Sequence, residues 1–155
     1  MGQALTQTEL QAKLAPLRSK SKIVFTNGCF DILHIGHITY LKQARALGDI
    51  LVVGVNSDAS VKRLKGDERP IQSENDRLEI LSSLACVDFA CIFTDDTPIK
   101  LIEAVKPDFL VKGGDWPVEK IVGYPFVSSY GGKTKSLPFV PSKSTTSILE
   151  KIKRI

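Results

Sequence analysis

The stretch that decides the fold reads Thr26-Asn27-Gly28-Cys29-Phe30-Asp31-Ile32-Leu33-His34-Ile35-Gly36-His37 and follows a β-rich run at residues 22–26. It contains neither the G-x-G-x-x-G pattern of dinucleotide sites nor the G-x-x-x-x-G-K-[ST] pattern of P-loops. These absences count against a dehydrogenase and against a P-loop kinase. Instead, two histidines three residues apart stand where a helix is expected to begin. This spacing puts both imidazoles on one helix face, within reach of one bound group.

The start of that helix has the chemistry of a phosphate site. Gly36 lets an anion approach the backbone closely, and a helix N-terminus offers unpaired N–H groups and a positive dipole end. His34 and His37 add side-chain donors, so the motif indicates a polyphosphate cradle. Two alternatives stay open for the pair: a turn-capping His34 beside a surface His37, and a zinc site. No third zinc ligand stands at a recognisable spacing.

Outward from this loop, β-rich runs alternate with helical patterns. The alternation predicts a doubly wound, Rossmann-like α/β fold with a five-stranded parallel sheet in the order 3-2-1-4-5. In that order the loop after the first strand faces residues 112–116 across the ligand crevice. The expected strands are 22–26, 50–55, 89–93, 109–111 and 134–137, and the expected helices are 37–47, 58–64, 74–84, 98–105, 119–130 and 145–153.

The N-terminal segment, residues 1–20, is expected to be an extension of a domain that spans residues 21–155. Leu10, Leu14 and Leu17 stand at helical spacing, which predicts an extra amphipathic helix over residues 6–17. We expect this helix to pack outside the core fold.

Composition limits the class of protein and the kind of partner. A chain of 155 residues that is 43% hydrophobic and 25% charged fits one soluble domain, with neither a membrane span nor a signal peptide, and so predicts a cytoplasmic protein. Cys29, Cys86 and Cys91 are then expected to be reduced thiols. The net charge of +4 favours an anionic partner. Without a basic run or a nucleic-acid motif, small phosphates are favoured over nucleic acid and membranes.

The loop resembles the signature of the cytidylyltransferase-like nucleotidyltransferase superfamily, a Gly-x-Phe-Asp turn before His-x-Gly-His at a helix start. Its members join a nucleoside triphosphate to a phosphorylated acceptor and release pyrophosphate. Ser144-Thr145-Thr146 resembles the second signature of that superfamily, a Ser/Thr-rich helix start that binds nucleotide. The alternative for these three residues is an ordinary helix N-cap.

A narrower resemblance, to the adenylyltransferase domain of bacterial ADP-heptose synthases, covers the chain from residue 21 onward. It rests on residues 26–37, 55–66, 69–70, 95–98, 111–115 and 137–140. It implies transfer of AMP from ATP, brought with Mg²⁺, to D-glycero-β-D-manno-heptose 1-phosphate for lipopolysaccharide core synthesis. It also implies a stand-alone enzyme served by a separate heptose kinase, and a homodimer. The chain departs from the pattern at residues 141–143, where relatives commonly carry a Glu-Gly-Arg run.

The candidate site combines the motifs with this resemblance, which assigns most of the roles. The expected catalytic residues are His34, His37 and Lys65. The expected nucleotide-binding residues are Cys29, Phe30, Gly36, Ser144, Thr145 and Thr146. The expected acceptor-binding residues are Lys62, Lys112, Asp115 and Trp116, and no residue is assigned as a metal ligand. Two further residues keep alternatives: Asp31 either holds magnesium indirectly or caps its turn, and Arg77 either reaches a phosphate or pairs with Asp76.

Two other classes of function stay open at this stage. A glycerol-3-phosphate cytidylyltransferase or a flavin-nucleotide synthetase of the same superfamily would share the histidine motif with a different acceptor. A non-catalytic nucleotide-binding module would share the fold but would not need donors for a leaving group. Pyrophosphate release separates the enzymes from the module.

Overall fold

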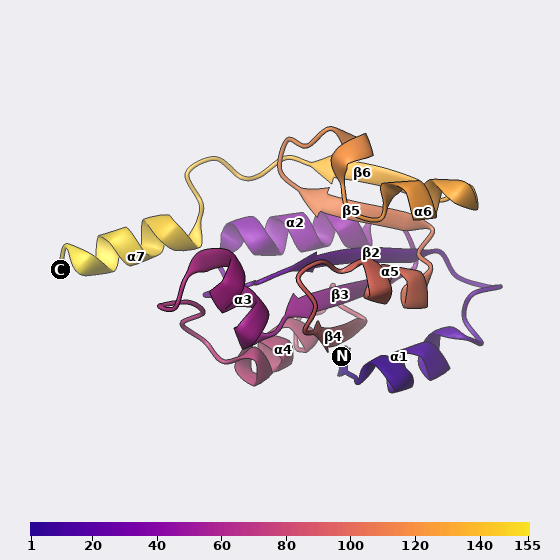
Figure 1. Ribbon diagram of the computed structural model, residues 1–155, viewed down its shortest axis with the longest axis horizontal. Helices are drawn as coiled ribbons and strands as arrows, with labels where there is room; N and C mark the ends of the chain where they lie inside the picture. The colour runs from indigo at the N-terminus through magenta and orange to yellow at the C-terminus, as the bar shows by residue number, and fades with distance from the viewer.

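Six parallel strands form one sheet in the computed structural model, which describes residues 1–155 (Figure 1). Their order is β1-β4-β3-β2-β5-β6. Without β1 this is the predicted order 3-2-1-4-5, which is confirmed. The strands are β1 (Gln3–Ala4), β2 (Ile23–Gly28), β3 (Ile50–Asn56), β4 (Phe89–Phe93), β5 (Phe109–Gly113) and β6 (Lys133–Leu137).

Helices cover both faces of the sheet, as a doubly wound fold requires. One face carries α1 (Gln7–Leu14), α5 (Ile99–Val105) and α6 (Tyr124–Ser129), and the other carries α2 (Ile35–Arg45) and α4 (Glu74–Ser82). The remaining helices are α3 (Asp58–Lys65), the 3₁₀ turn η1 (Val118–Lys120) and α7 (Thr145–Lys153). α7 extends away from the body and buries none of its residues (Figure 1).

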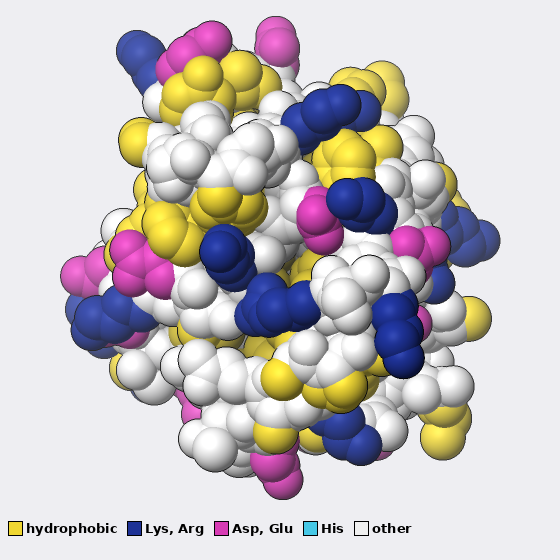
Figure 2. Space-filling model, turned by 90° about the vertical axis from the view of Figure 1, so that its right-hand side faces the viewer, with side chains coloured by type: hydrophobic (Ala, Val, Ile, Leu, Met, Phe, Trp, Pro, Cys, Tyr) yellow, Lys and Arg dark blue, Asp and Glu magenta, His cyan; other side chains and the backbone are white.

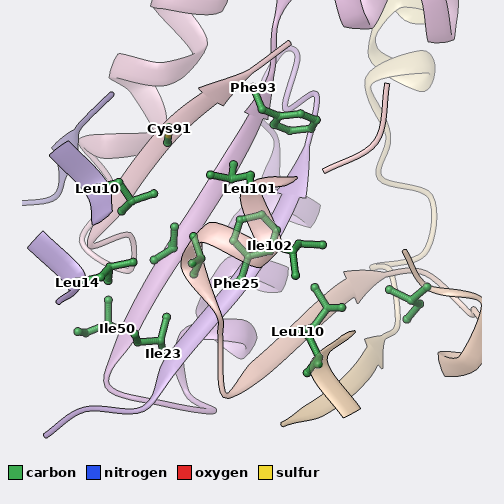
Figure 3. Close-up of a cluster of buried hydrophobic side chains, with 14 residues drawn as sticks. Leu10, Leu14, Ile23, Phe25, Ile50, Cys91, Phe93, Leu101, Ile102 and Leu110 are labelled. Carbon is green, nitrogen blue, oxygen red and sulfur yellow. The ribbon is translucent and has the colours of Figure 1, made fainter. Parts of the chain in front are cut away.

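The two covered faces explain the sequence pattern of the central strands. Side chains alternate between the faces, so Phe25 of β2 packs with α1 and α5 (Figure 3), while its neighbour Val24 packs with α2. β3 is buried along its whole length, which is why it reads as a continuous apolar run. Each fully buried aliphatic or aromatic side chain stabilises the fold by about 1.5–3 kcal/mol.

The predictions of five strands and of an N-terminal helix outside the core were wrong. β1 adds a sixth strand, because Gln3 N donates to Asp88 O at 2.9 Å and Leu5 N donates to Ala90 O at 2.9 Å. α1 then lies against the sheet, and its Leu10 and Leu14 are buried in the core shown in Figure 3. Helical spacing indicates an apolar stripe but not what the stripe packs against, which is why the placement failed.

The single helix predicted over residues 119–130 was also wrong. The segment forms η1 and α6 with a break at Gly123, whose φ of +93° lies in the left-handed region. A side chain at this glycine would lie 2.8 Å from the Ile102 side chain, so close packing on α5 fixes the break.

Two predictions from composition can be compared with the structure. All three cysteines are free, as predicted. None of the helices combines the length and the apolar character that crossing a membrane requires. Figure 2 views the face where the strands begin, opposite the site described below. Lys and Arg side chains are mixed there with acidic and apolar ones, and no histidine is visible.

Candidate active site

Two adjoining cavities of about 500 Å³ each lie at the carboxyl ends of the strands. The inner cavity is bounded by the loop after β2 and by Lys112 at the end of β5. The tail cavity is bounded by His34, Arg69 and residues 139–147. β2 and β5 are neighbours at the point where strand order reverses, which is where ligands bind in doubly wound sheets. The residues that line both cavities are His37, Tyr40, Lys65, Phe139 and Thr145.

Asp31 fixes the shape of the loop between β2 and α2. Its buried carboxylate accepts hydrogen bonds from Arg69 Nε at 2.9 Å, from Ile71 N at 2.9 Å and from Gln72 N at 3.0 Å. Burial alone would raise the pKa of Asp31, but these donors outweigh it and lower the pKa. Of the two alternatives for Asp31, the structure thus supports capping of a turn.

This loop carries backbone strain that those bonds hold in place. Phe30 and Ile32, on either side of Asp31, both have φ of +51°. Left-handed backbone at a residue other than glycine costs on the order of 1–3 kcal/mol and clusters at functional sites. The Asp31 carboxylate therefore stabilises a conformation that the loop would not adopt alone.

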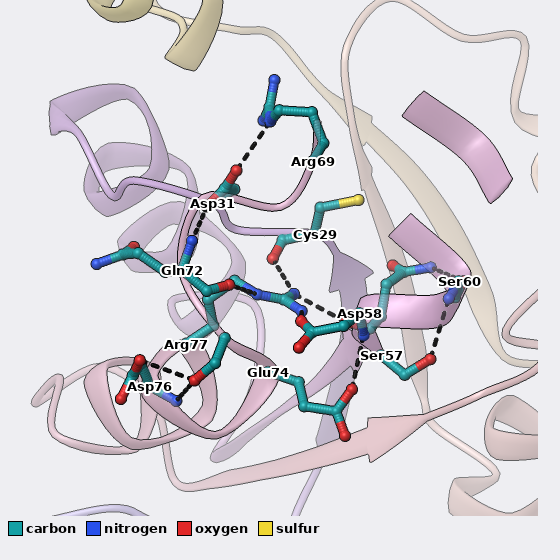
Figure 4. A network of polar contacts seen from close by, with 12 residues as sticks. Cys29, Asp31, Ser57, Asp58, Ser60, Arg69, Gln72, Glu74, Asp76 and Arg77 are labelled. Carbon is teal, nitrogen blue, oxygen red and sulfur yellow. Dashed lines mark hydrogen bonds and ion pairs between the residues drawn. The ribbon is translucent and has the colours of Figure 1, made fainter. Parts of the chain in front are cut away.

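Arg77 of α4 lies beneath the loop and is only 1% exposed (Figure 4). Its guanidinium donates to Cys29 O at 2.6 Å, to Asn56 O at 2.8 Å and to Gln72 O at 3.0 Å. Its remaining partner is Asp58 Oδ1 at 2.8 Å. The structure thus supports neither alternative for Arg77, since it pairs with Asp58 rather than Asp76 and is used up within the protein. It joins the histidine loop to the end of β3 and the start of α3.

His34 is the N-cap of α2, so the capping alternative is correct for this residue without excluding a role in binding. Its Nδ1 accepts a hydrogen bond from Gly36 N at 3.1 Å, so the neutral ring carries its proton on Nε2, a donor for a ligand. A side chain at position 36 would lie 2.9 Å from the His34 ring, so the glycine makes room for the cap.

His37 is stacked on His34, with 3.9 Å between the ring centroids, and its other neighbour is the edge of Phe30 at 5.5 Å. Burial, with the nearby His34 and Lys65, lowers the pKa of His37 to about 4, so the ring is neutral near pH 7. Its Nδ1 is buried and has no hydrogen-bond partner, in contrast to the satisfied polar atoms of the loop. Buried polar atoms are rarely left without a partner, and in a cavity lining a ligand can supply one.

Only some of the lysines predicted to bind phosphate lie at the cavities. Lys65, at the end of α3, lines both cavities, whereas Lys62 one turn earlier is exposed and lines neither. Lys112 is half-buried in the inner cavity opposite the histidine loop. Burial lowers its pKa, Cys29 opposes that shift, and Lys65 adds to it. Two cations thus face one cavity.

Two glycines at the end of β5 leave room for two aromatic rings that pack against them. A side chain at Gly113 would lie 2.9 Å from the Phe139 ring, and one at Gly114 would lie 2.7 Å from Trp116 Nε1. Trp116 is 54% exposed and Phe139 is 68% exposed. Asp115, between the glycines and the tryptophan, is exposed and lines neither cavity.

The tail cavity closes over the start of α2. Ser144 caps α7 by accepting from Ser147 N at 3.0 Å, and Thr145 Oγ1 donates to Asp31 O at 2.6 Å. The Ser144-Thr145-Thr146 motif therefore caps a helix, as the alternative had it, and also lines the tail cavity. The tail cavity is lined by basic side chains and by no carboxylate. The basic side chains are those of His34, His37, Lys65, Arg69 and Lys143.

The sequence motifs include Asn27, Arg69 and Phe139 but assigned them no role, and they did not include Tyr40; all four line these cavities. Tyr40 and Thr26 share a buried hydrogen bond of 2.5 Å, and burial raises the pKa of this phenol. Tyr40 lies three residues after His37, so helical spacing alone could have found it.

The family model described as cytidylyltransferase-like matches residues 25–148. The chain belongs to the cytidylyltransferase-like family. This confirms the family resemblance predicted from the sequence, and with it the nucleotidyltransferase class.

Individual relatives agree with this assignment. Proteins named "Bifunctional protein HldE" are 58% identical in Geotalea uraniireducens (strain Rf4), over 85% of this chain, and 54% identical in Helicobacter pylori (strain Shi470), over 97%. The chain spans 27% and 34% of those relatives. A crystal structure of a lipopolysaccharide core biosynthesis protein from Thermoplasma volcanium GSS1 is 36% identical, with a TM-score of 0.63 over 79% of this chain and 99% of that one.

A more distant structure supports the fold alone. Pantoate-beta-alanine ligase from Francisella tularensis is 18% identical and has a TM-score of 0.64, over 100% of this chain and 79% of that one.

A cytidylyltransferase-like site that uses a divalent metal must hold it through protein ligands or receive it with the nucleotide. No group of three or more His, Cys, Asp or Glu side chains in this chain could hold a metal ion. The buried Asp31 carboxylate is occupied by protein donors. A metal that arrives with a triphosphate needs no such group, because Mg²⁺ is usually held by one or two carboxylates together with substrate phosphates and water.

Proposed function

We propose that the chain is an adenylyltransferase that transfers AMP from ATP to D-glycero-β-D-manno-heptose 1-phosphate and releases pyrophosphate. The observation that carries the proposal is the junction of two cavities at His37 and Lys65. The tail cavity has cations and no carboxylate, which suits a triphosphate, and Lys112 in the inner cavity suits the phosphate of an acceptor. The HldE relatives and the lipopolysaccharide core protein support a heptose as that acceptor.

The reaction needs alignment and charge stabilisation more than proton transfer. The acceptor phosphate has a second pKa of about 6, so it is an anion near pH 7 and needs no general base. Its oxygen attacks the α-phosphorus, the bond from that phosphorus to the bridging oxygen breaks, and pyrophosphate leaves with the electron pair. His34, His37 and Lys65 donate to the oxygens on which charge builds up.

The remaining predicted roles follow from where the residues lie. Gly36, Ser144, Thr145 and Thr146 line the tail cavity and are proposed to bind the nucleotide, together with Cys29 at the mouth of the inner cavity. Phe30 is buried against His37 and supports that ring. Lys112 and Trp116 are proposed to meet the acceptor. Trp116 lines a smaller cavity that shares Lys112 with the inner one, whereas Lys62 and Asp115 line none of the three and are left out.

The proposal also includes the metal, the pathway, the domain bounds and the oligomeric state. ATP enters as its Mg²⁺ complex, a heptose kinase activity supplies the heptose 1-phosphate, and the ADP-heptose serves lipopolysaccharide core synthesis in the cytoplasm. Residues 21–155 form the nucleotidyltransferase domain and residues 1–20 form an extension that covers one edge of its sheet. The enzyme works as a homodimer.

Steady-state pyrophosphate release tests this proposal with ATP or CTP against heptose 1-phosphate or glycerol 3-phosphate. We expect turnover with ATP and heptose 1-phosphate, and loss of that turnover in His37→Ala. Preference for CTP with glycerol 3-phosphate would identify a glycerol-3-phosphate cytidylyltransferase instead, and turnover of ATP with a flavin mononucleotide would identify a flavin-nucleotide synthetase. Nucleotide binding without pyrophosphate release from any pair would identify a non-catalytic module.

A further inference from the structure

A third, smaller cavity of about 240 Å³ adjoins the inner cavity on the side away from the tail. The two cavities share Asn27, Pro98, Lys112 and Val122 as lining residues. We call the smaller one the side cavity. At about 30 Å³ per water molecule it has room for about eight waters. That is enough for a short hydroxylated chain and too little for a nucleotide.

The lining of the side cavity is that of a carbohydrate site. Trp116 gives it an aromatic face, Ile121 and Val122 give it apolar walls, and Lys112 and Lys120 give it two ammonium groups with no carboxylate among the lining residues. The Asn27 amide offers both a donor and an acceptor. Flat apolar surface with a few polar groups matches a sugar chain, whose C–H faces are apolar and whose rim carries hydroxyls.

Trp116 is fixed in place although it is exposed. Its backbone N–H donates to Ser136 Oγ at 3.1 Å, and the Ser136 hydroxyl donates to Gly114 O. Gly114 N in turn donates to Leu137 O at 2.8 Å. The turn that carries the tryptophan is therefore bound to β6, and the ring packs against Gly114, where an added side chain would lie 2.7 Å from Nε1. A wall held in this way needs little ordering when a ligand arrives.

We propose that the side cavity binds the carbon chain of the acceptor beyond its reacting phosphate, with Lys120 determining the sugar length that is accepted. This inference rests on the proposed function and deepens it. Lys112 stands at the boundary of the two cavities and binds the acceptor phosphate. The sugar then extends along Trp116, and a heptose places its terminal hydroxyls beside Lys120, which the chain of a hexose does not reach.

The first test compares Lys120→Met with wild type on heptose 1-phosphate and on mannose 1-phosphate. Losing the ammonium should lower kcat/KM for the heptose substrate about tenfold or more and leave the hexose value unchanged, because only the longer chain meets this residue. The KM for ATP should not change. Lys133→Met, at the opposite end of β6 from the site, is the control and should match wild type. Equal losses with both sugars, or no loss with either, would overturn the proposal.

The second test does not depend on turnover. Trp116 is the only tryptophan in the chain, so intrinsic fluorescence reports directly on the side cavity. Heptose 1-phosphate should change the emission at lower concentration than mannose 1-phosphate, and inorganic phosphate should leave it unchanged. A response to ATP but not to sugar phosphates would overturn the side-cavity proposal. A sugar-phosphate response without pyrophosphate release would instead overturn the proposed activity and leave the binding site standing.

Discussion

The two segments that enclose the tail cavity, where we propose that the triphosphate binds, are held to the protein in opposite ways. The histidine loop, residues 27–37, is fixed by its own Asp31 and by Arg77 beneath it; both are buried, the Asp31 carboxylate accepts three hydrogen bonds and the Arg77 guanidinium donates four. The tail segment, residues 139–147, is mostly exposed, and a single hydrogen bond, from Thr145 to Asp31, joins it to the body.

This difference suggests how binding energy is used at each side. Donors on the histidine loop are already in position, so they can stabilise developing charge without reorganising. The tail must lose conformational freedom when a nucleotide binds beneath it, which lowers affinity rather than turnover. Changes at the loop should therefore affect stability and kcat, and changes at the tail should affect the KM for the nucleotide.

The largest effect is expected from Arg77→Met, which removes the support of the histidine loop. Three carbonyls and Asp58, which is 37% exposed, lose their partner. Each buried acceptor left without its donor costs about 1–3 kcal/mol in the free energy of unfolding. Arg63→Met is the matched control, because the Arg63–Asp96 pair is exposed on both sides and should contribute at most about 1 kcal/mol. Urea unfolding measures both; similar losses in the two variants would mean that the loop is not held by Arg77.

His37→Ala should remove one hydrogen-bond donor from the histidine loop and leave the conformation of the loop unchanged. Loss of one donor to developing charge costs about 3 kcal/mol, so kcat should fall by about a hundredfold or more. His34→Ala should lower kcat similarly and also cost about 1 kcal/mol of stability through the lost helix cap. Stopped assays of pyrophosphate, with circular dichroism as the check of folding, test both. A folded variant with near wild-type turnover would exclude that histidine from catalysis.

Lys65 is proposed to contact the nucleotide and Lys112 the acceptor, so substitutions of the two lysines should cause different kinetic defects. Lys65 lines both cavities, so Lys65→Ala should impair nucleotide use and kcat, while Lys112→Ala should raise the KM for the acceptor. A lost hydrogen bond to a charged group corresponds to about 10- to 100-fold in either quantity. Titration of each substrate at saturating levels of the other measures this; reversed defects would exchange the two roles.

The buried histidine also makes stability depend on pH. In the unfolded chain His37 gains a proton near pH 6.5, whereas in the folded protein its pKa is about 4. Between these values the unfolded state binds more protons, so stability should rise with pH, by about 1–2 kcal/mol from pH 5 to pH 7.5. His34, whose pKa burial also lowers, contributes in the same direction. His37→Gln should flatten the rise in urea midpoints, and an unchanged slope would show that His37 is not the source.

The smallest effect is expected at the tail. Thr145→Val removes its one hydrogen bond to the loop, worth about 1 kcal/mol, and should raise the KM for ATP about fivefold with kcat and the urea midpoint nearly unchanged. Thr8→Val on α1 is the control and should behave as wild type. A drop in kcat as large as that of the histidine variants would mean that the tail is as preorganised as the loop.

Local patterns were sufficient to predict the central sheet, because apolar runs alternating with helices leave few ways to connect parallel strands. They failed where a contact partner decides the outcome. β1 is two residues long and has no β-rich signal, since its pairing is set by β4. Arg77 pairs with Asp58 of another helix rather than with its neighbour Asp76, which no spacing rule could indicate. By contrast, Pro125 just after Gly123 was a visible signal that the expected helix over residues 119–130 begins late.

The pairing of β1 with β4 has a consequence for how the chain is made. Residues 3–14 are synthesised before β4, but Gln3 pairs with Phe89, so their place in the sheet exists only once β4 has been synthesised. Until then Leu10 and Leu14 have no core to enter. A nascent chain stalled before β4 should expose these leucines to chaperones, and residues 3–14 should gain protection from hydrogen exchange only after β4 has formed.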